Sequence, residues 1–231
     1  DAKKRSGLLT ISYERDSLLG NKISTPLFIN LAPNYDLTYT PSFFRKDNIH
    51  HNAKYRHLFN NAKLDTEISY VKENKELRNY FQANDINLTK EKSSKWAINT
   101  NYNQTLPNDW NLALNSKKTS DHSYLRRYRE DFNFYQTSQL NLNKKTSSNF
   151  TSVNMSHYDD FRWRDQNKEN NNFYKLPNVK FYDVRKLNYL KLNNEFDLDL
   201  IHLKRNSQTN LSRISATDTI SKDFIFSSGL K

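Results

Sequence analysis

The sequence predicts an all-β fold, an antiparallel transmembrane β-barrel of the outer-membrane type, with about twelve strands in this chain. Three observations predict it. Apolar and polar residues alternate with a period of two along most of the chain. Short and long connections alternate between the expected strands. The composition is basic and aromatic but poor in apolar residues, with a net charge of +11, 13% aromatic and 35% hydrophobic residues.

The period of two is clearest from residue 22 to residue 31. Ile23, Leu27 and Ile29 share one parity, whereas Lys22 and Asn30 fall on the other. Because the polar parity of such segments carries Lys, Asp, Glu and Asn, one face of each expected strand must contact water. The same alternation returns over residues 35–43, 64–70, 96–102, 110–114 and 196–200.

The connections between these segments alternate in length. We expect short ones at residues 32–34, 60–62, 104–109 and 143–147, and long ones at residues 72–92, 119–131 and 162–172. The link at residues 45–48 is short where a long one is expected. In the second long connection, Arg126, Arg127 and Arg129 lie close to Glu130 and Asp131. A solvated and self-neutralised loop is the commoner outcome for such a segment, and contact of these arginines with phosphate groups at a membrane surface is the alternative.

Composition also excludes several classes of site. The chain has no Cys, so it offers no disulfide, thiolate metal ligand or cysteine nucleophile. Of its six His, only His50 and His51 are adjacent, and no metal-ligand spacing appears. No nucleophile, base and orienting residue can be grouped. We therefore expect no catalytic residue, no metal, no cofactor and no enzyme activity.

Two other function classes share some of these features. A basic, aromatic chain is also typical of nucleic-acid-binding proteins, but here acidic residues share the faces of the basic ones and no recognition motif is present. A different outer-membrane barrel, such as a porin or a receptor-type transporter, would have the same architecture.

Specific motifs favour one family. The segments 4–9 (KRSGLL) and 23–41 (ISTPLFINLAPNYDLTYTP) resemble the start of the barrel in LptD, the family of lipopolysaccharide-assembly proteins of Gram-negative outer membranes. Asp109-Trp110, Ser120-Asp121 and the segment 124–128 (YLRRY) resemble its alphaproteobacterial branch, and the segment 174–177 (YKLP) a later strand entry. The resemblance implies that residues 1–231 are a single partial domain, the first strands of a barrel of about 26 strands, with no second domain.

The resemblance also implies function, location and partners. Such a protein lies in the bacterial outer membrane and receives lipopolysaccharide from an LptA-type periplasmic bridge. It passes the lipid part through a lateral opening of the barrel and the sugars through a lumen plugged by an LptE-type lipoprotein. The barrel assembly machinery would insert it, and no nucleic acid would be bound.

The same resemblance implies that the opening lies between the first and last strands of the barrel. In the family, prolines in the first two strands weaken the hydrogen-bond ladder beside the opening, because Pro has no N–H to donate. Pro26 occupies the second-strand position, whereas Ile11 stands at the first-strand position. Leu9 belongs to the same expected first strand, from Leu8 to Glu14.

Charged residues on the polar parity are the candidates to line the lumen. A basic lumen suits phosphorylated sugars, although the commoner role of such residues is to keep the interior solvated and to pair with acidic neighbours such as Asp36. These candidates are Lys22, Lys54, Arg56, Lys63, Asp65 and Glu67.

Overall fold

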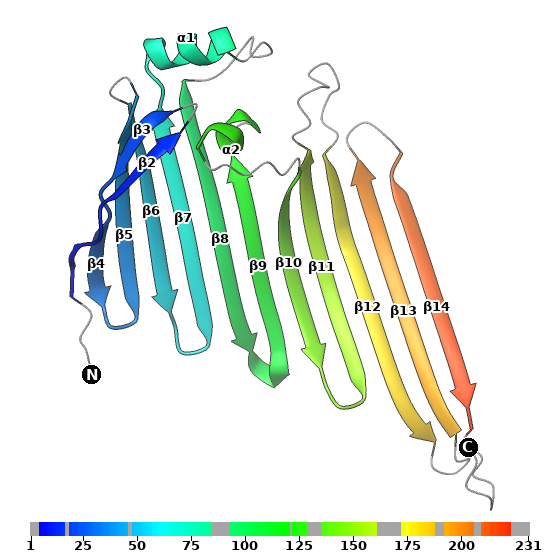
Figure 1. The fold of residues 1–231 in the computed structure, drawn as a ribbon. Helices are drawn as coiled ribbons and strands as arrows, with labels where there is room; N and C mark the ends of the chain where they lie inside the picture. Colours follow the sequence, from blue (N-terminus) through cyan, green and yellow to red (C-terminus); the bar gives the residue numbers. More distant parts are fainter. Residues whose placement is uncertain are drawn as a thin grey trace, which may run out of the picture. The chain divides into compact units, whose positions relative to one another are not determined.

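A computed structural model describes residues 5–16, 19–45, 48–84, 93–120, 122–128, 135–160, 172–187, 192–205 and 209–222 (Figure 1). Two α-helices and one 3-10 helix accompany the strands in these residues: α1 (Lys75–Asn84), α2 (His122–Tyr128) and η1 (Pro107–Asp109). The strands are β1 (Gly7–Leu8), β2 (Ser12–Asp16), β3 (Gly20–Ser24), β4 (Leu27–Ala32), β5 (Tyr35–Phe44), β6 (Asn48–Leu58), β7 (Ala62–Lys72), β8 (Ser94–Leu106), β9 (Trp110–Thr119), β10 (Tyr135–Lys145), β11 (Asn149–Asp160), β12 (Phe173–Leu187), β13 (Leu192–Arg205) and β14 (Leu211–Ser221).

The strands form an antiparallel sheet in which neighbours in sequence are neighbours in space. Its order is β1-β4-β5-β6-β7-β8-β9-β10-β11-β12-β13-β14, and β3 pairs with both β2 and β5 beside this path. The predicted all-β antiparallel fold is thereby confirmed, and the sheet has 14 strands in the described part of the chain, where about twelve were expected. Among the described residues, no helix has the length and apolar character that crossing a membrane would require.

The connections alternate as the sequence predicts. Residues 73–93 join β7 to β8 and residues 120–134 join β9 to β10, whereas residues 33–34 suffice between β4 and β5. Figure 1 shows α1 and α2 at the same end of their strands. At the opposite end, the turn between β8 and β9 holds Asn108 and Asp109 at φ 59° and 61°, a left-handed conformation that Asn and Asp adopt more readily than most residues.

By internal contacts the chain divides into two compact units. The first consists mainly of residues 1–103 and 115–136, and the second of residues 104–114, 137–160 and 165–231. The first unit contains both helices and the cluster of buried apolar side chains.

In the first unit, the first two expected strands are each split in two. The first consists of β1, which pairs with β4, and β2, which pairs with β3. Leu8 faces Leu27 and Leu9 bonds to Pro26, while Ser12 faces Ser24. Residues 9–12 of the first strand therefore contain one residue more than residues 24–26, which they face. This extra residue is a β-bulge, which bends a strand and interrupts its ladder, so the strand expected from Leu8 to Glu14 is not continuous.

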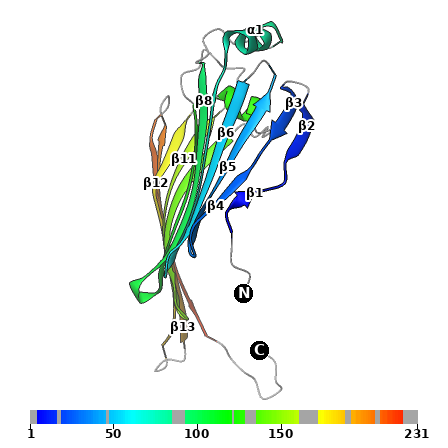
Figure 2. The same ribbon diagram turned by 90° about the vertical axis from the view of Figure 1, so that its left-hand side faces the viewer.

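The two helices cover one face of the first unit's sheet at its long-connection end. Asn74 caps α1, because its Oδ1 accepts the backbone N–H of Leu77 at 2.9 Å. Leu77, Tyr80 and Phe81 follow the i, i+3, i+4 spacing that places apolar residues on one side of a helix. Figure 2 shows β2 and β3 projecting to the same side of β5 and β6 as α2. The buried cluster under the helices consists of Leu19, Phe44, Val71, Leu77, Phe81, Ala97, Tyr124 and Leu125.

The second unit is built from long paired strands. Its registers shift between Asn154 and Ser156 on β11, and between Lys175 and Asn178 on β12. Both shifts flank Pro177, which lacks the N–H that a regular ladder needs. On the last described strand, β14, every residue is exposed.

Candidate functional site: a polar face, a seam break and a helical cap

Five of the six residues predicted to line a lumen lie together on β6 and β7. The register pairs Lys54 with Glu67, and Arg56 with Asp65, directly across the two strands. Cross-strand partners share a face of the sheet, as do residues two apart on one strand. Lys63 therefore joins Asp65 and Glu67 on this face. We call it the polar face.

The sixth residue, Lys22, lies on the same face but in a different strand. Ser24, two residues further along β3, contacts Ser42 of β5 through their hydroxyl groups at 2.8 Å. Ser42 shares the parity of Asp36 on β5, and Asp36 pairs across the strands with Arg56. The Nζ of Lys22 pairs with Glu14 at 2.9 Å rather than with the charges of β6 and β7.

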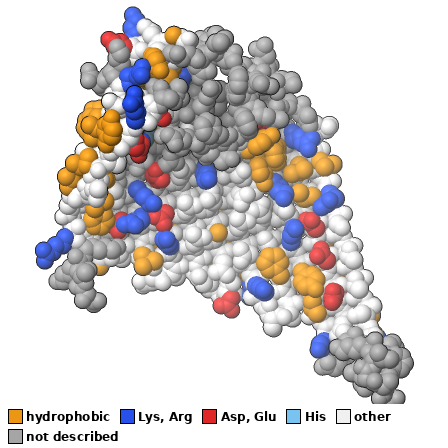
Figure 3. Space-filling model, viewed as in Figure 1, with side chains coloured by type: hydrophobic (Ala, Val, Ile, Leu, Met, Phe, Trp, Pro, Cys, Tyr) orange, Lys and Arg blue, Asp and Glu red, His pale blue; other side chains and the backbone are white. Residues whose placement is uncertain are grey.

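Acidic neighbours neutralise much of the basic charge on the polar face. Arg56 Nε lies 2.8 Å from Asp36 Oδ1, and the Asp36 side chain is only 5% exposed. Lys63 Nζ lies 3.2 Å from Asp65 Oδ2. Figure 3, which views the face that bears α2, shows basic and acidic side chains side by side on it. The face therefore presents paired charges to water, with a hydrophilic rather than a uniformly cationic surface.

The second feature is the seam break, formed by residues 9–11 of the first strand and residues 25–26 of the second. The N–H of Leu9 donates to the Pro26 carbonyl at 2.8 Å, but Pro26 has no N–H to return. The N–H of Thr25 donates to the Pro41 carbonyl at 3.1 Å, and Pro41 has none to return either. In an antiparallel ladder such facing pairs exchange two bonds. The ladder that joins Leu9 to Pro26 and the ladder that joins Thr25 to Pro41 therefore each lack one hydrogen bond.

Ile11 lies in the bulged part of the seam break, and Pro26 is half-buried between β3 and β4. Leu9 and Ile11 are 47% and 53% exposed. The structure thus brings Leu9 and Pro26 into direct contact and places Ile11 beside them. The sequence reasoning did not single out Pro41, although a proline within an alternating segment is itself a signal of a weakened ladder.

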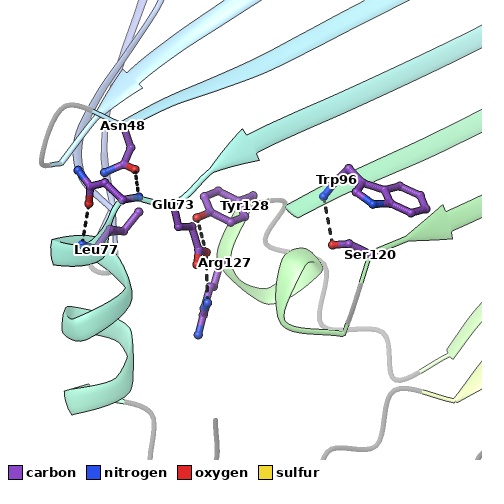
Figure 4. Close-up of polar contacts among 8 residues, drawn as sticks. Asn48, Glu73, Leu77, Trp96, Ser120, Arg127 and Tyr128 are labelled. Carbon is purple, nitrogen blue, oxygen red and sulfur yellow. Dashed lines mark hydrogen bonds and ion pairs between the residues drawn. The ribbon is translucent and has the colours of Figure 1, made fainter. Parts of the chain in front are cut away.

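The third feature is the helical cap, which consists of α1, α2 and the polar residues that they bury. Arg127 of α2 pairs with Glu73 at 3.2 Å, and their side chains are 2% and 0% exposed (Figure 4). The hydroxyl of Tyr128 donates to the same Glu73 oxygen at 2.7 Å. The guanidinium carbon of Arg127 also lies 4.0 Å from the ring centre of Phe81 in α1. These contacts join the two long connections to each other.

Further hydrogen bonds tie the helical cap to the strands. The Tyr124 hydroxyl donates to Ser69 Oγ at 2.5 Å and also lies 2.9 Å from Nε2 of His50. Because the Tyr124 phenol donates its proton to Ser69, its oxygen acts as the acceptor in the contact with His50. The imidazole must then donate, which requires a proton on Nε2 of His50. Burial raises the pKa of the Tyr128 phenol well above its ordinary value of 10.0, and the Glu73 carboxylate raises it further. Tyr128 therefore stays a neutral hydrogen-bond donor at physiological pH.

The expectation of a solvated arginine loop is wrong for Arg127. This residue is buried, and its partner is Glu73 from another connection rather than the nearby acidic residues. The sequence did not reveal the ion pair between Glu73 and Arg127, because 54 positions separate the two residues. Arg129, Glu130, Asp131 and the side chain of Arg126 lie outside the described residues.

The arrangement does not suggest a metal centre. Within the part of the chain that the structure describes, no group of three or more His, Asp or Glu residues could hold a metal ion.

The comparisons with known proteins agree on one family. Residues 93–230, more than half of the chain, match the family described as LPS transport system D, LptD. A relative in Nitrosomonas eutropha named LPS-assembly protein LptD is 27% identical over 150 residues, which are 65% of this chain and 18% of the relative.

Two further relatives carry the same name. The one in Cupriavidus necator is 30% identical over 151 residues, covering 65% of this chain and 16% of the relative. The one in Aliivibrio fischeri is 24% identical over 123 residues, covering 53% of this chain and 14% of the relative. The chain thus spans less than a fifth of the length of each of these curated relatives.

Proposed function

Because the chain belongs to the LPS transport system D family, LptD, we propose that it works in the assembly of lipopolysaccharide at the bacterial outer membrane, as part of a translocon that inserts this lipid into the outer leaflet. The family assignment confirms the predicted resemblance and the predicted outer-membrane localisation. The alphaproteobacterial detail stays a prediction.

The observation that carries the proposal is the family match over residues 93–230. The names of the relatives and the antiparallel sheet with alternating polar and apolar residues support it. Porins and receptor-type transporters share such a sheet but not this family match, and a nucleic-acid-binding protein shares neither. Neither alternative is favoured.

In this proposal the polar face lines the aqueous path of the sugars. Arg56 and Lys63 offer cations to sugar phosphates at short range, and Asp36 and Asp65 limit how tightly such phosphates are held. A face of paired charges lets a charged polymer pass without trapping it.

In this proposal the lateral exit for the lipid part lies between the first and last strands of the barrel, and the seam break lies beside it. Parting two strands costs less where ladder bonds are already missing, and Pro26 and Pro41 each remove one. The bulge at Ile11 supplies the irregularity that the family's first-strand proline would give. Leu9 and Ile11 are exposed and apolar, which suits contact with acyl chains.

The proposed partners follow from the family. They are lipopolysaccharide itself, an LptE-type lipoprotein in the lumen, an LptA-type periplasmic bridge and the barrel assembly machinery. Because the family is one of transport and assembly, we propose that the chain makes and breaks no bond and needs no cofactor.

Depletion of the protein in its own host tests the proposal. We expect newly made lipopolysaccharide, followed by pulse labelling, to stop reaching the cell surface while an unrelated porin still reaches the outer membrane. Depletion of that porin is the matched control and should leave lipopolysaccharide export unchanged. Normal surface lipopolysaccharide after depletion, with a loss of small-solute uptake instead, would replace the proposal with the porin alternative.

A further inference from the structure

A cavity lies at the long-connection end of the β2–β3 hairpin. It has a volume of about 510 Å³ and is lined by Arg15, Asp16, Gly20, Asn21 and Arg45. Arg15 faces Asn21, and Asp16 faces Gly20, across the two strands. Arg45 follows the end of β5. We call it the arginine cavity. None of its lining residues belongs to the polar face of β6 and β7 or to the seam break.

Arg45 is held in this cavity from several sides. Its backbone N–H donates to the Leu19 carbonyl at 3.2 Å, and its own carbonyl accepts from the Asn48 side chain at 3.0 Å. Its guanidinium carbon lies 4.2 Å from the centre of the Tyr80 ring in α1. The two hydrogen bonds hold the Arg45 backbone, and the contact with the Tyr80 ring restricts the guanidinium, which lowers the side-chain entropy lost on binding a ligand.

Gly20 makes room for this arrangement. Its φ of +75° belongs to the left-handed region, and a Cβ at this position would stand 3.4 Å from Arg45 Nε. Any other residue would strain the backbone at this φ, and its Cβ would fill the space beside the arginine. Asp16, at the end of β2, is hydrogen-bonded to the residue that precedes β3, because its Oδ1 accepts the backbone N–H of Leu19 at 2.6 Å.

The charges of the arginine cavity do not cancel. Among the described residues, no carboxylate forms an ion pair with Arg15 or Arg45, and the nearby Glu14 pairs with Lys22 instead. Of the five lining residues, two carry guanidinium groups and one, Asp16, carries a carboxylate. Asn21 adds an amide that can donate hydrogen bonds.

We propose that the arginine cavity binds a phosphate group, either free or carried by a phosphorylated glycolipid. A phosphate has enough acceptor oxygens and charge to bind two guanidinium groups and an amide at once. A carboxylate has two oxygens, and a single guanidinium group can bind both. The volume exceeds what one phosphate needs and leaves space for the sugar that carries it. The binding site rests on its own geometry, and only its link to lipopolysaccharide rests on the proposed function.

Calorimetric titration tests this on the protein in its natural length, in dodecyl maltoside micelles, which contain no phosphate. The probes are inorganic phosphate, bis-phosphorylated lipid A, and the same lipid A with both phosphates removed. The key variant is the double substitution Arg15→Gln/Arg45→Gln. Its control, Arg185→Gln/Arg213→Gln, also removes two positive charges, from side chains that are 70% and 64% exposed on β12 and β14.

We expect the double variant to bind a phosphate-bearing probe at least about tenfold more weakly than wild type, with the control unchanged. Binding of inorganic phosphate identifies a small-anion site, and binding of phosphorylated lipid A alone identifies a glycolipid site. Arg15 is exposed, so Arg15→Gln alone should weaken binding without disturbing the fold. Gly20→Ala should weaken it too, because a side chain at φ +75° strains the backbone beside Arg45.

Equal affinities in the two double variants, or no binding of either phosphate-bearing probe by wild type, would overturn the arginine cavity as a phosphate site. That result would leave the proposed function intact if depletion still blocks export. Conversely, phosphate binding by a protein whose depletion leaves surface lipopolysaccharide unchanged would overturn the proposed function and not the site.

Discussion

The seam break and the helical cap belong to the same unit but differ in almost every physical respect. At the seam break, apolar side chains such as Leu9 and Ile11 are exposed, two ladder bonds are missing, and a bulge interrupts the first strand. In the helical cap, apolar side chains are buried, and even the charged pair of Glu73 and Arg127 is removed from water.

The difference teaches where this unit keeps its rigidity. All the apolar residues of its buried cluster lie under the helices or next to them, and none lies at the seam break. Regions with few buried contacts and few hydrogen bonds open at low free energy, whereas packed cores open at high free energy. The helical cap is thus firmly held, and the strand edge at the seam break is the part free to move.

Breaking the buried ion pair is the strongest way to test the comparison. Arg127→Ala leaves the Glu73 carboxylate buried without its cation, which should destabilise the helical cap by about 3–5 kcal/mol. Hydrogen exchange of the α1 and α2 amides measures this local opening. Arg213→Ala, which removes a 64% exposed arginine paired with Asp199 at 3.3 Å, should cost less than about 1 kcal/mol. Equal protection of α2 in both variants would contradict the assigned role of the pair.

A matched pair of leucines sharpens the contrast. Leu77 is fully buried in α1, so Leu77→Ala should cost about 2–5 kcal/mol through lost contacts and a residual cavity. Leu8 is 64% exposed on β1, and Leu8→Ala should change stability by less than about 0.5 kcal/mol. Protease cleavage of the long connections in increasing urea compares the two. A larger loss for Leu8→Ala would reverse the assignment of rigid and mobile regions.

The helical cap should also weaken at high pH, because of Tyr128. The folded protein raises the pKa of this phenol above the unfolded value of 10.0, so the folded state keeps a proton that the unfolded state releases. The contribution is complete below pH 10 and falls above it by at most about 1.4 kcal/mol per pH unit. Subtilisin cleavage of the α1 and α2 connections between pH 9 and pH 11 should show this slope in wild type, and Tyr128→Phe should flatten it. An unchanged slope would assign the pH effect to another group.

At the seam break, the expected effect is the smallest. Pro26→Ala or Pro41→Ala restores an N–H, and each new ladder bond should tighten the strand edge by about 1 kcal/mol and slow lipopolysaccharide export severalfold. Pro107→Ala, in the turn between β8 and β9, is the control and should leave the export rate unchanged. Normal export with normal barrel assembly in both seam variants would show that these prolines are merely tolerated there.

Much of the sheet could be predicted because its signal is local. A period of two assigns Lys54, Arg56, Lys63, Asp65 and Glu67 to one parity, and the register places these five on one face. The division into short and long connections was equally visible. The bulge in the first strand could not be predicted from the sequence, because it is a mismatch between two pairing registers and is not a property of either strand alone.

The sequence by itself determined the strands, their faces and the family, because alternation and motif spacing are properties of neighbouring residues. Only the tertiary structure decided the partners of residues that are far apart along the chain. Glu73 and Arg127 each occur in a polar connection that suits solvent, and Arg15 and Arg45 carry no motif. Folding buries the first pair and leaves the second lining an open cavity. The physical reason is that desolvation and charge pairing depend on which surfaces meet, and no local pattern encodes that.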